Sequence, residues 1–167
     1  HTGFMQWTAN EPLNNLDAYK AKIARVMPSE LMSQRQQLFG LTPVTMPFSE
    51  TYSALQTGAI DGQDNPLPNV QNMKFYEVMD QIVLTSHLVG YDLLVISNSA
   101  WESLSPEGQE AVQAAADEVI AWSQNMHLEM EASLLEEFQA AGLNIYEPDQ
   151  DAFRAYAQQR YLDSEIS

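Results

Sequence analysis

The stretch that decides the fold occupies residues 46–67 and reads MPFSETYSALQTGAIDGQDNPL. Ser49 stands directly before a helix-forming run, where its hydroxyl can accept a hydrogen bond from a free backbone N–H of the first turn. Gly58 follows that run and is the residue type that most often ends a helix. The pair Asp61 and Gly62 then signals a turn. We therefore predict the end of a strand, a short helix and a polar turn.

Asn65 follows this turn and stands directly before Pro66. Because proline disfavours the α region for the residue before it, we expect Asn65 to be extended, with its amide projecting from a fixed backbone. An amide in that position offers a ligand both a donor and an acceptor. The alternative is an asparagine that only stabilises its own turn, and the local sequence does not decide between the two.

Arg25 lies inside an apolar strand that we predict at residues 22–27, stopped by Pro28. A guanidinium in a buried strand must be met by an anion, because an unpaired buried charge is costly. That anion is either one of the 23 acidic residues of the chain or a ligand carboxylate, which the guanidinium fork holds by two parallel hydrogen bonds. The carboxyl end of a strand, just before a helix opened by Ser29, favours the ligand, because open α/β sheets bind ligands there.

Strands and helices alternate along the chain with short connections. We expect helices at residues 29–39, 50–56, 72–77 and 149–161, and strands at residues 3–8, 22–27, 43–46, 81–85, 91–97 and 144–146. The alternation predicts an α/β fold with parallel βαβ units and right-handed crossovers. Trp7, in the first strand, is either a core residue or a stacking surface beside a cleft.

A long helix is predicted between Ser105, a capping residue followed by Pro106, and the stop at Gly142. Its apolar residues recur at the spacing of one helical face: Val112, Ala115, Val119, Met126, Met130, Leu134 and Phe138. We expect this stripe, together with Trp122, to be core. At a length of about 54 Å the helix exceeds what one ordinary domain needs, so it either bridges two lobes or breaks partway.

The composition narrows the function classes. The chain has 167 residues, 45% of them hydrophobic, so it can bury a core. Seven basic against 23 acidic residues give a net charge of −16, which argues against nucleic-acid or anionic-membrane partners. The chain has no cysteine, which removes disulfides, zinc–thiolate sites and thiol catalysis.

Motifs for catalysis and metal binding are missing from the sequence. It has no glycine-rich phosphate loop, no H-E-x-x-H and no G-x-S-x-G. His87 has no second histidine at ligand spacing, and Asp61 and Asp64 supply too few oxygens for a cation, so turn stabilisation is the better interpretation. We expect no catalytic residue, no metal and no cofactor.

Four segments together resemble one known family along nearly the whole chain. They are residues 22–29 (KIARVMPS), residues 46–67, residues 74–78 (KFYEV) and residues 101–106 (WESLSP). This combination is similar to the DctP-type substrate-binding proteins of TRAP (tripartite ATP-independent periplasmic) transporters. The resemblance implies a non-enzymatic, two-lobed periplasmic receptor. Such a receptor closes around a small organic acid and delivers it to membrane permease subunits.

The resemblance also implies site residues. Arg25 matches the family arginine that clamps the ligand carboxylate, Asn65 matches the cleft asparagine, and Phe48 matches an aromatic that packs on the ligand. Met5 stands where several members carry a second arginine. With Trp7 close by, this departure favours a monocarboxylate with an apolar or cationic body over a dicarboxylate or sialic acid.

Members of the family are considerably longer, and this chain resembles them only from where their second lobe begins. By the family pattern, residues 1–90 form the second ligand-binding lobe. Residues 91–130 hold a strand and the first part of the long helix, which pack with the first lobe, and residues 131–167 complete the helix and the C-terminal segment. The first lobe is not in this sequence. The chain is then either part of a longer protein or a stand-alone half whose apolar surfaces need a partner.

Two other functions remain open at this point. The main alternative is a truncated receptor that acts as a dimerising or interaction module without a transport ligand of its own. A small acid-binding lyase that uses Arg25 and an acid near Asp61 is a distant third.

Overall fold

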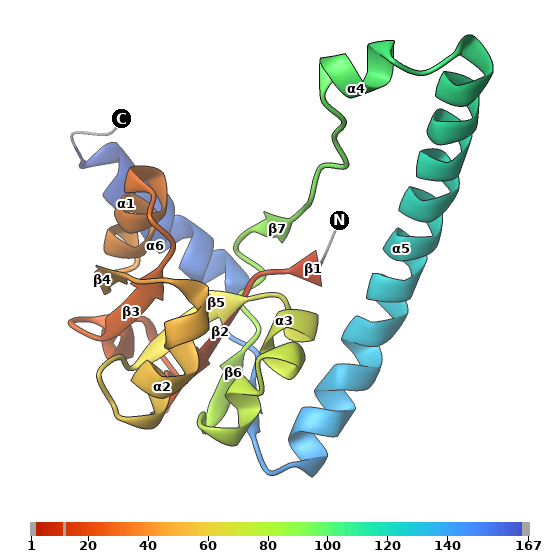
Figure 1. Ribbon diagram of the computed structural model, residues 1–167. Helices are drawn as coiled ribbons and strands as arrows, with labels where there is room; N and C mark the ends of the chain where they lie inside the picture. The colour runs from red at the N-terminus through yellow and green to blue at the C-terminus, as the bar shows by residue number, and fades with distance from the viewer. Residues whose placement is uncertain (1–2, 12, 165–167) are drawn as a thin grey trace.

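The computed structural model describes residues 3–11 and 13–164, and a six-stranded sheet forms its centre (Figure 1). The strand order is β4 (Thr42–Thr45), β3 (Ile23–Val26), β5 (Gly62–Asn65), β2 (Gln6–Ala9), β6 (Gln81–Val83) and β8 (Asn144–Tyr146). Two short strands, β1 (Gly3–Phe4) and β7 (Val89–Gly90), pair antiparallel with each other beside it. The α/β class predicted from the sequence is therefore confirmed.

The sheet is mixed, and the predicted parallel βαβ arrangement holds for part of it, as in β3, helix α1 (Glu30–Leu38) and β4. β3 runs parallel to β4 and β5, and β6 runs parallel to β8. β2 is antiparallel to both of its neighbours, β5 and β6. Periodicity and loop length do not report strand direction, and β2 precedes the first helical crossover, so nothing local fixed its direction.

Helices pack against the sheet, except α4 (Asn98–Glu102) and the first half of α5 (Pro106–Ala140), which stand clear of it (Figure 1). The helices in chain order are η1 (Leu16–Tyr19), α1, η2 (Phe48–Glu50), α2 (Thr51–Gln56), α3 (Leu67–Asn72), η3 (Phe75–Glu77), α4, α5 and α6 (Gln150–Leu162). α1 and α6 lie side by side, with Phe39 contacting Phe153 at 6.1 Å between ring centroids (Figure 1). η3 packs with the end of α5, where Tyr76 and Phe138 lie 5.5 Å apart.

The stretch at residues 46–67 forms a helix as predicted, but it enters that helix differently. Ser49 lies inside the 3₁₀ turn η2, and α2 follows without a side-chain cap. Gly58 ends the helical segment in the left-handed region, at φ 71°, as expected.

The end of that stretch is a central strand and not a polar turn. All four residues of β5 are buried between β3 and β2. A Cβ on Gly62 would stand 2.5 Å from the carbonyl oxygen of Thr8, so the close approach of the two strands requires glycine. Asn65 is extended before Pro66, as predicted.

The long helix α5 is also confirmed. The Ser105 hydroxyl accepts a hydrogen bond from the Gly108 backbone N–H at 3.2 Å, and Gly142 follows the helix with φ 98°. Only its C-terminal end joins the core, where Leu134 and Phe138 are buried. Trp122 is 61% exposed, which corrects its assignment to the core. Figure 1 shows the first half of α5 running clear of the sheet.

Residues 91–97 form no strand, contrary to the prediction. They lead away from β7 towards α4, and their apolar side chains are exposed: Tyr91, Leu93, Leu94, Val95 and Ile96 (Figure 1). A strand needs a neighbour to hydrogen-bond to, and the described residues provide none for this segment. Among the helices of residues 3–11 and 13–164, none is both long and apolar enough to cross a membrane.

Candidate solute-binding groove

A groove of about 440 Å³ lies where β3 and β5 end, and we call it the Arg25 groove. Because these parallel strands point the same way, their carboxyl ends meet at one edge of the sheet. Met5, strand β7 with its neighbouring residues, and helix α1 complete its wall. The lining residues are Met5, Arg25, Val26, Met27, Leu31, Met32, Arg35, Asp64, Asn65, Leu88, Val89, Gly90 and Tyr91.

Arg25 is fixed in this groove at 7% exposure. Its Nε and Nη2 donate to the carbonyl oxygen of Met46 at 3.2 and 3.1 Å. No carboxylate of the described residues forms an ion pair with it. Burial lowers the pKa of Arg25, and the nearby charge of Asp64 opposes that shift. Of the two anions proposed from the sequence, a protein carboxylate is not found within 4.0 Å of the guanidinium in the described part of the chain, although Asp64 lies close enough for its charge to act on Arg25.

The ring of Phe48 packs against the guanidinium of Arg25. The guanidinium carbon lies 5.3 Å from the centroid of the Phe48 ring, and that ring meets Phe75 edge-on at 5.7 Å. Phe48 is half-buried and is not among the residues that line the groove. Its position therefore supports a role in orienting Arg25 more directly than a contact with a ligand.

Asn65 lines the groove, but its amide is already in use. Its Nδ2 donates to Oε1 of Gln63, and its Oδ1 accepts from Nδ2 of Asn69 at 3.2 Å. An asparagine amide has two N–H bonds. Only one of them has an acceptor among the described residues, so one donor remains for a ligand.

Met5 also lines the groove, at the end of the β1 ribbon. Its backbone N–H donates to the Leu88 carbonyl at 2.8 Å, which ties it to the segment before β7. The Met5 side chain supplies apolar surface at the position where several members of the DctP-type family carry a second arginine.

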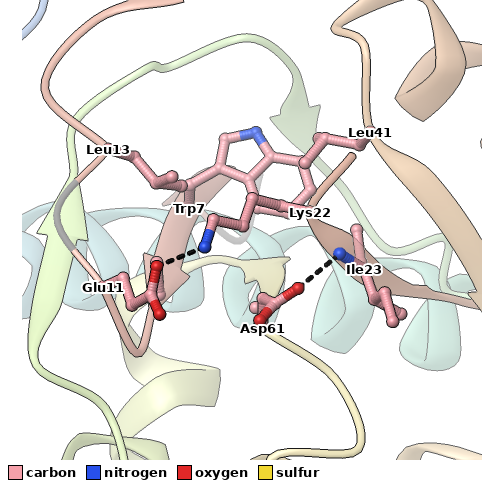
Figure 2. Close-up of a pocket in the computed structure, with 10 residues that line it drawn as sticks. Trp7, Glu11, Leu13, Lys22, Ile23, Leu41 and Asp61 are labelled. Atoms are coloured by element: carbon pink, nitrogen blue, oxygen red, sulfur yellow. Dashed lines mark hydrogen bonds and ion pairs between the residues drawn. The ribbon is translucent and has the colours of Figure 1, made fainter. Parts of the chain in front are cut away.

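Trp7 is a core residue, which corrects its placement beside the ligand. Its side chain is 1% exposed. Its ring stacks on His87 and meets Tyr19 edge-on, with 6.0 and 6.4 Å between the ring centroids. Successive residues of a strand point to opposite faces, and the face that holds Trp7 is covered by α1 and α6. Trp7 does border a cavity at the far end of β2, shown with Glu11, Lys22 and Asp61 in Figure 2. At about 10 Å³, that cavity has room for about one water and not for an organic acid.

Sequence reasoning missed Arg35, and it did not connect Asp64 and His87, which the fold brings together with Arg35. Arg35 on α1 donates from Nη2 to Oδ2 of Asp64 at 2.5 Å. Nε2 of His87 lies 3.0 Å from the same oxygen of Asp64. Nδ1 of His87 lies 2.7 Å from the hydroxyl oxygen of Thr85. Asp64 is therefore a buried strand residue and not a turn stabiliser. No local signal connects these positions, because they are far apart in sequence.

Within residues 3–11 and 13–164, no three carboxylate or imidazole side chains cluster as ligands for an ion. The site offers a guanidinium, an amide N–H and apolar walls, which suit a small organic anion.

Comparison with known proteins agrees with this chemistry. The family model for bacterial extracellular solute-binding proteins, family 7 (DctP), matches residues 1–166. The sialic acid-binding periplasmic protein SiaP of Vibrio cholerae is 38% identical over 99% of this chain and 52% of its own length.

Solved structures give the same result. A TRAP periplasmic solute-binding protein of Roseobacter denitrificans with bound 3-deoxy-D-manno-oct-2-ulosonic acid has a TM-score of 0.92 and 37% identity, covering 98% of this chain and 55% of that one. One from Shewanella oneidensis with bound succinate has a TM-score of 0.87 and 29% identity, covering 100% and 57%.

The chain thus spans about half the length of the relatives that it matches. The family match covers nearly every residue of this chain, and the relatives named above are solute-binding proteins of transport systems and not enzymes. By sequence and by fold, this chain belongs to the DctP family of bacterial extracellular solute-binding proteins, the receptors of TRAP transporters.

Proposed function

We propose that this chain forms one wall of the ligand cleft of a periplasmic TRAP receptor. In this role Arg25 clamps the carboxylate of a small organic acid, and the loaded receptor delivers the acid to membrane permease subunits. The observation that carries the proposal is a buried guanidinium that lines a groove and has no carboxylate partner among the described residues.

The physical reason is the cost of that arrangement without a ligand. A guanidinium has five N–H donors, and the two hydrogen bonds found for Arg25 both go to one carbonyl oxygen. A neutral acceptor does not balance a buried charge. A ligand carboxylate would supply both the charge and the acceptor oxygens, with Asn65 donating one further hydrogen bond.

We further propose that a first lobe provides the opposite wall. Residues 91–130 carry an exposed apolar surface with a groove of about 580 Å³ between the 94–96 segment and α5. Its lining is mostly aliphatic and includes Trp101, Val112 and Val119. An exposed apolar surface of this size usually marks a site of contact with another protein surface. The chain spans only about half the length of its relatives, so a first lobe is the contact that we propose.

The apolar lining favours a monocarboxylate with an apolar or cationic body. Met5, Val26, Met32 and Leu88 place apolar surface around the Arg25 guanidinium. The solutes of the relatives are carboxylates, including sialic acid and succinate, so the class agrees while the individual solute remains a proposal.

Calorimetric titration of the intact receptor, with both walls of the cleft present, tests the clamp. The panel contains sialic acid, 3-deoxy-D-manno-oct-2-ulosonic acid, succinate, malate and aliphatic monocarboxylates. We expect Arg25→Gln to abolish measurable binding of whichever acid binds. The matched control is Arg154→Gln, an exposed arginine on α6. Equal affinities for wild type and Arg25→Gln would refute the clamp, and tight binding of malate or succinate only would refute the monocarboxylate.

An interaction module without a ligand is the second candidate, and the exposed apolar surface of residues 91–130 is the observation in its favour. Light scattering during the same titration separates the two functions. A receptor binds one acid per cleft without a change in mass, whereas a module of this kind forms dimers and does not respond to any acid.

A further inference from the structure

The Arg25 groove contains a second guanidinium, on Arg35, whose charge is already paired. Arg35 and Asp64 form an ion pair at 2.5 Å, and their side chains are 17% and 5% exposed. Arg35 reaches the groove from helix α1, on one face of the sheet, whereas Arg25 packs against Phe48 at the other face. The two arginines therefore approach the same edge of the sheet from opposite sides.

Asp64 is held firmly in place. Its Oδ1 accepts from Nε2 of Gln36 at 3.2 Å, and its Oδ2 faces both Arg35 and Nε2 of His87. Three contacts from α1 and from the 85–87 segment fix a carboxylate that stands on a central strand. Asp64 therefore has little freedom to leave Arg35.

The charges that line the groove follow from this pairing. Arg25 and Arg35 are positive and Asp64 is negative, and no other lining residue carries a formal charge. Since Asp64 is paired with Arg35, one positive charge is left for a ligand, and it lies on Arg25.

We propose that Asp64 determines how many carboxylates the ligand carries, by keeping Arg35 away from it. The inference rests on the proposed function, in which Arg25 binds the first carboxylate. With Asp64 in place the groove selects a single carboxylate. Without that negative charge, Arg35 becomes a second anion-binding residue and the groove accepts a dicarboxylate.

Arg35 has the donors that this role needs. Its Nε and Nη1 are buried and have no hydrogen-bond partner among the described residues. Among the described residues, the head group is hydrogen-bonded through Nη2 to Asp64. A head group released from Asp64 that turns into the groove could therefore offer these N–H groups to a carboxylate without breaking another hydrogen bond to the described residues. Arg35 thus acts as a specificity-determining residue, and Asp64 positions it.

Asp64→Asn is a conservative test of this role. The amide oxygen can still accept from Arg35, so the shape of the contact is kept while the charge is lost. His87 shares Oδ2 with Arg35, so its Nε2 can still donate to the amide oxygen. On the other side, the new amide nitrogen would face Gln36, whose side-chain amide can turn to present Oε1, an acceptor that has no hydrogen-bond partner among the described residues.

The experiment compares two matched pairs of acids on the intact receptor by calorimetric titration: butyrate with succinate, and hexanoate with adipate. In each pair a methyl group replaces one carboxylate, and the two lengths allow for different spans. We expect wild type to prefer the monoacid of at least one pair. We expect Asp64→Asn to shift the affinity ratio of that pair by about tenfold or more towards the diacid. The double variant Asp64→Asn/Arg35→Gln should return the ratio to that of wild type.

Each other outcome overturns the inference. The inference fails if wild type binds neither pair of acids. It also fails if the affinity ratio changes less than twofold in Asp64→Asn, or if the double variant keeps the increased relative affinity for the diacid. Near-ultraviolet circular dichroism and the thermal midpoint confirm that each variant is folded. Failure of the clamp is a separate result, because it requires Arg25→Gln to leave monoacid affinity unchanged.

Discussion

Replacing Arg25 by lysine keeps the positive charge and removes the guanidinium fork. In the structure that fork is oriented by two hydrogen bonds to the Met46 carbonyl and by the Phe48 ring at 5.3 Å. We expect the lysine variant to lose one charge-assisted hydrogen bond to the ligand, worth about 1.5–3 kcal/mol. It should also lose part of the cation–π contact, worth about 0.5–1 kcal/mol. The sum of about 2–4 kcal/mol corresponds to a loss of affinity of roughly 30- to 1,000-fold.

Isothermal titration calorimetry of the intact receptor measures this loss with the acid that wild type binds most tightly. Arg154→Lys on α6 is the matched control, because its side chain is exposed and is not among the residues that line the groove. We expect the control to stay within twofold of wild type. A change of less than threefold in Arg25→Lys would show that only charge matters at this position and would refute the bidentate geometry. An equal loss in both variants would show that the effect is not local.

Four stability measurements test other parts of the structure. Gly62→Ala should destabilise the protein by about 1–3 kcal/mol in urea unfolding, because its Cβ would stand 2.5 Å from the Thr8 carbonyl oxygen; an unchanged midpoint would contradict the close approach. Phe138→Ala should cost about 3–5 kcal/mol in the same assay, since this buried ring joins α5 to the core, and a loss below about 1 kcal/mol would mean that α5 does not dock there. Arg25→Met should leave the ligand-free protein as stable as wild type or more stable, because it removes a buried charge without a carboxylate partner in the described chain; a lower thermal midpoint would argue against that. Burial raises the pKa of the Tyr19 hydroxyl, so the folded protein keeps this proton at a pH where the unfolded chain releases it. The free energy of unfolding therefore falls as the pH rises above about 10, the ordinary pKa of tyrosine. Tyr19→Phe has no such group and should lose less stability than wild type between about pH 8 and pH 11 in urea unfolding.

Several local features were read correctly from the sequence, although the cap expected at Ser49 was not. The Ser105 cap, the stop at Gly142 and the left-handed Gly58 depend on neighbours within four residues, and each appears as predicted. Arg25 at the carboxyl end of its strand is also a local inference, because the apolar run and Pro28 define that strand. The family resemblance rests on such segments, and the match over residues 1–166 confirms it.

Partners that are distant in sequence could not be read from it. Residues 62–65 look like a turn because glycine and polar residues dominate them, yet they form a central strand whose side chains find partners on Thr8 and on α1. Residues 91–97 look like a buried strand, yet a strand exists only where another strand accepts its hydrogen bonds.

The amino-acid sequence alone was enough to predict the fold class and the family, and it singled out Arg25 as the residue that we propose to hold a carboxylate. Composition, periodicity and short motifs carry that information, because each acts over a few residues. Only the tertiary structure decided that Trp7 is core, that Phe48 lies beside the guanidinium of Arg25, and that Asp64 pairs with Arg35 at the same groove. Those contacts join residues from separate elements, and the free energy of an ion pair or a packed ring depends on which elements meet and on how completely they exclude water.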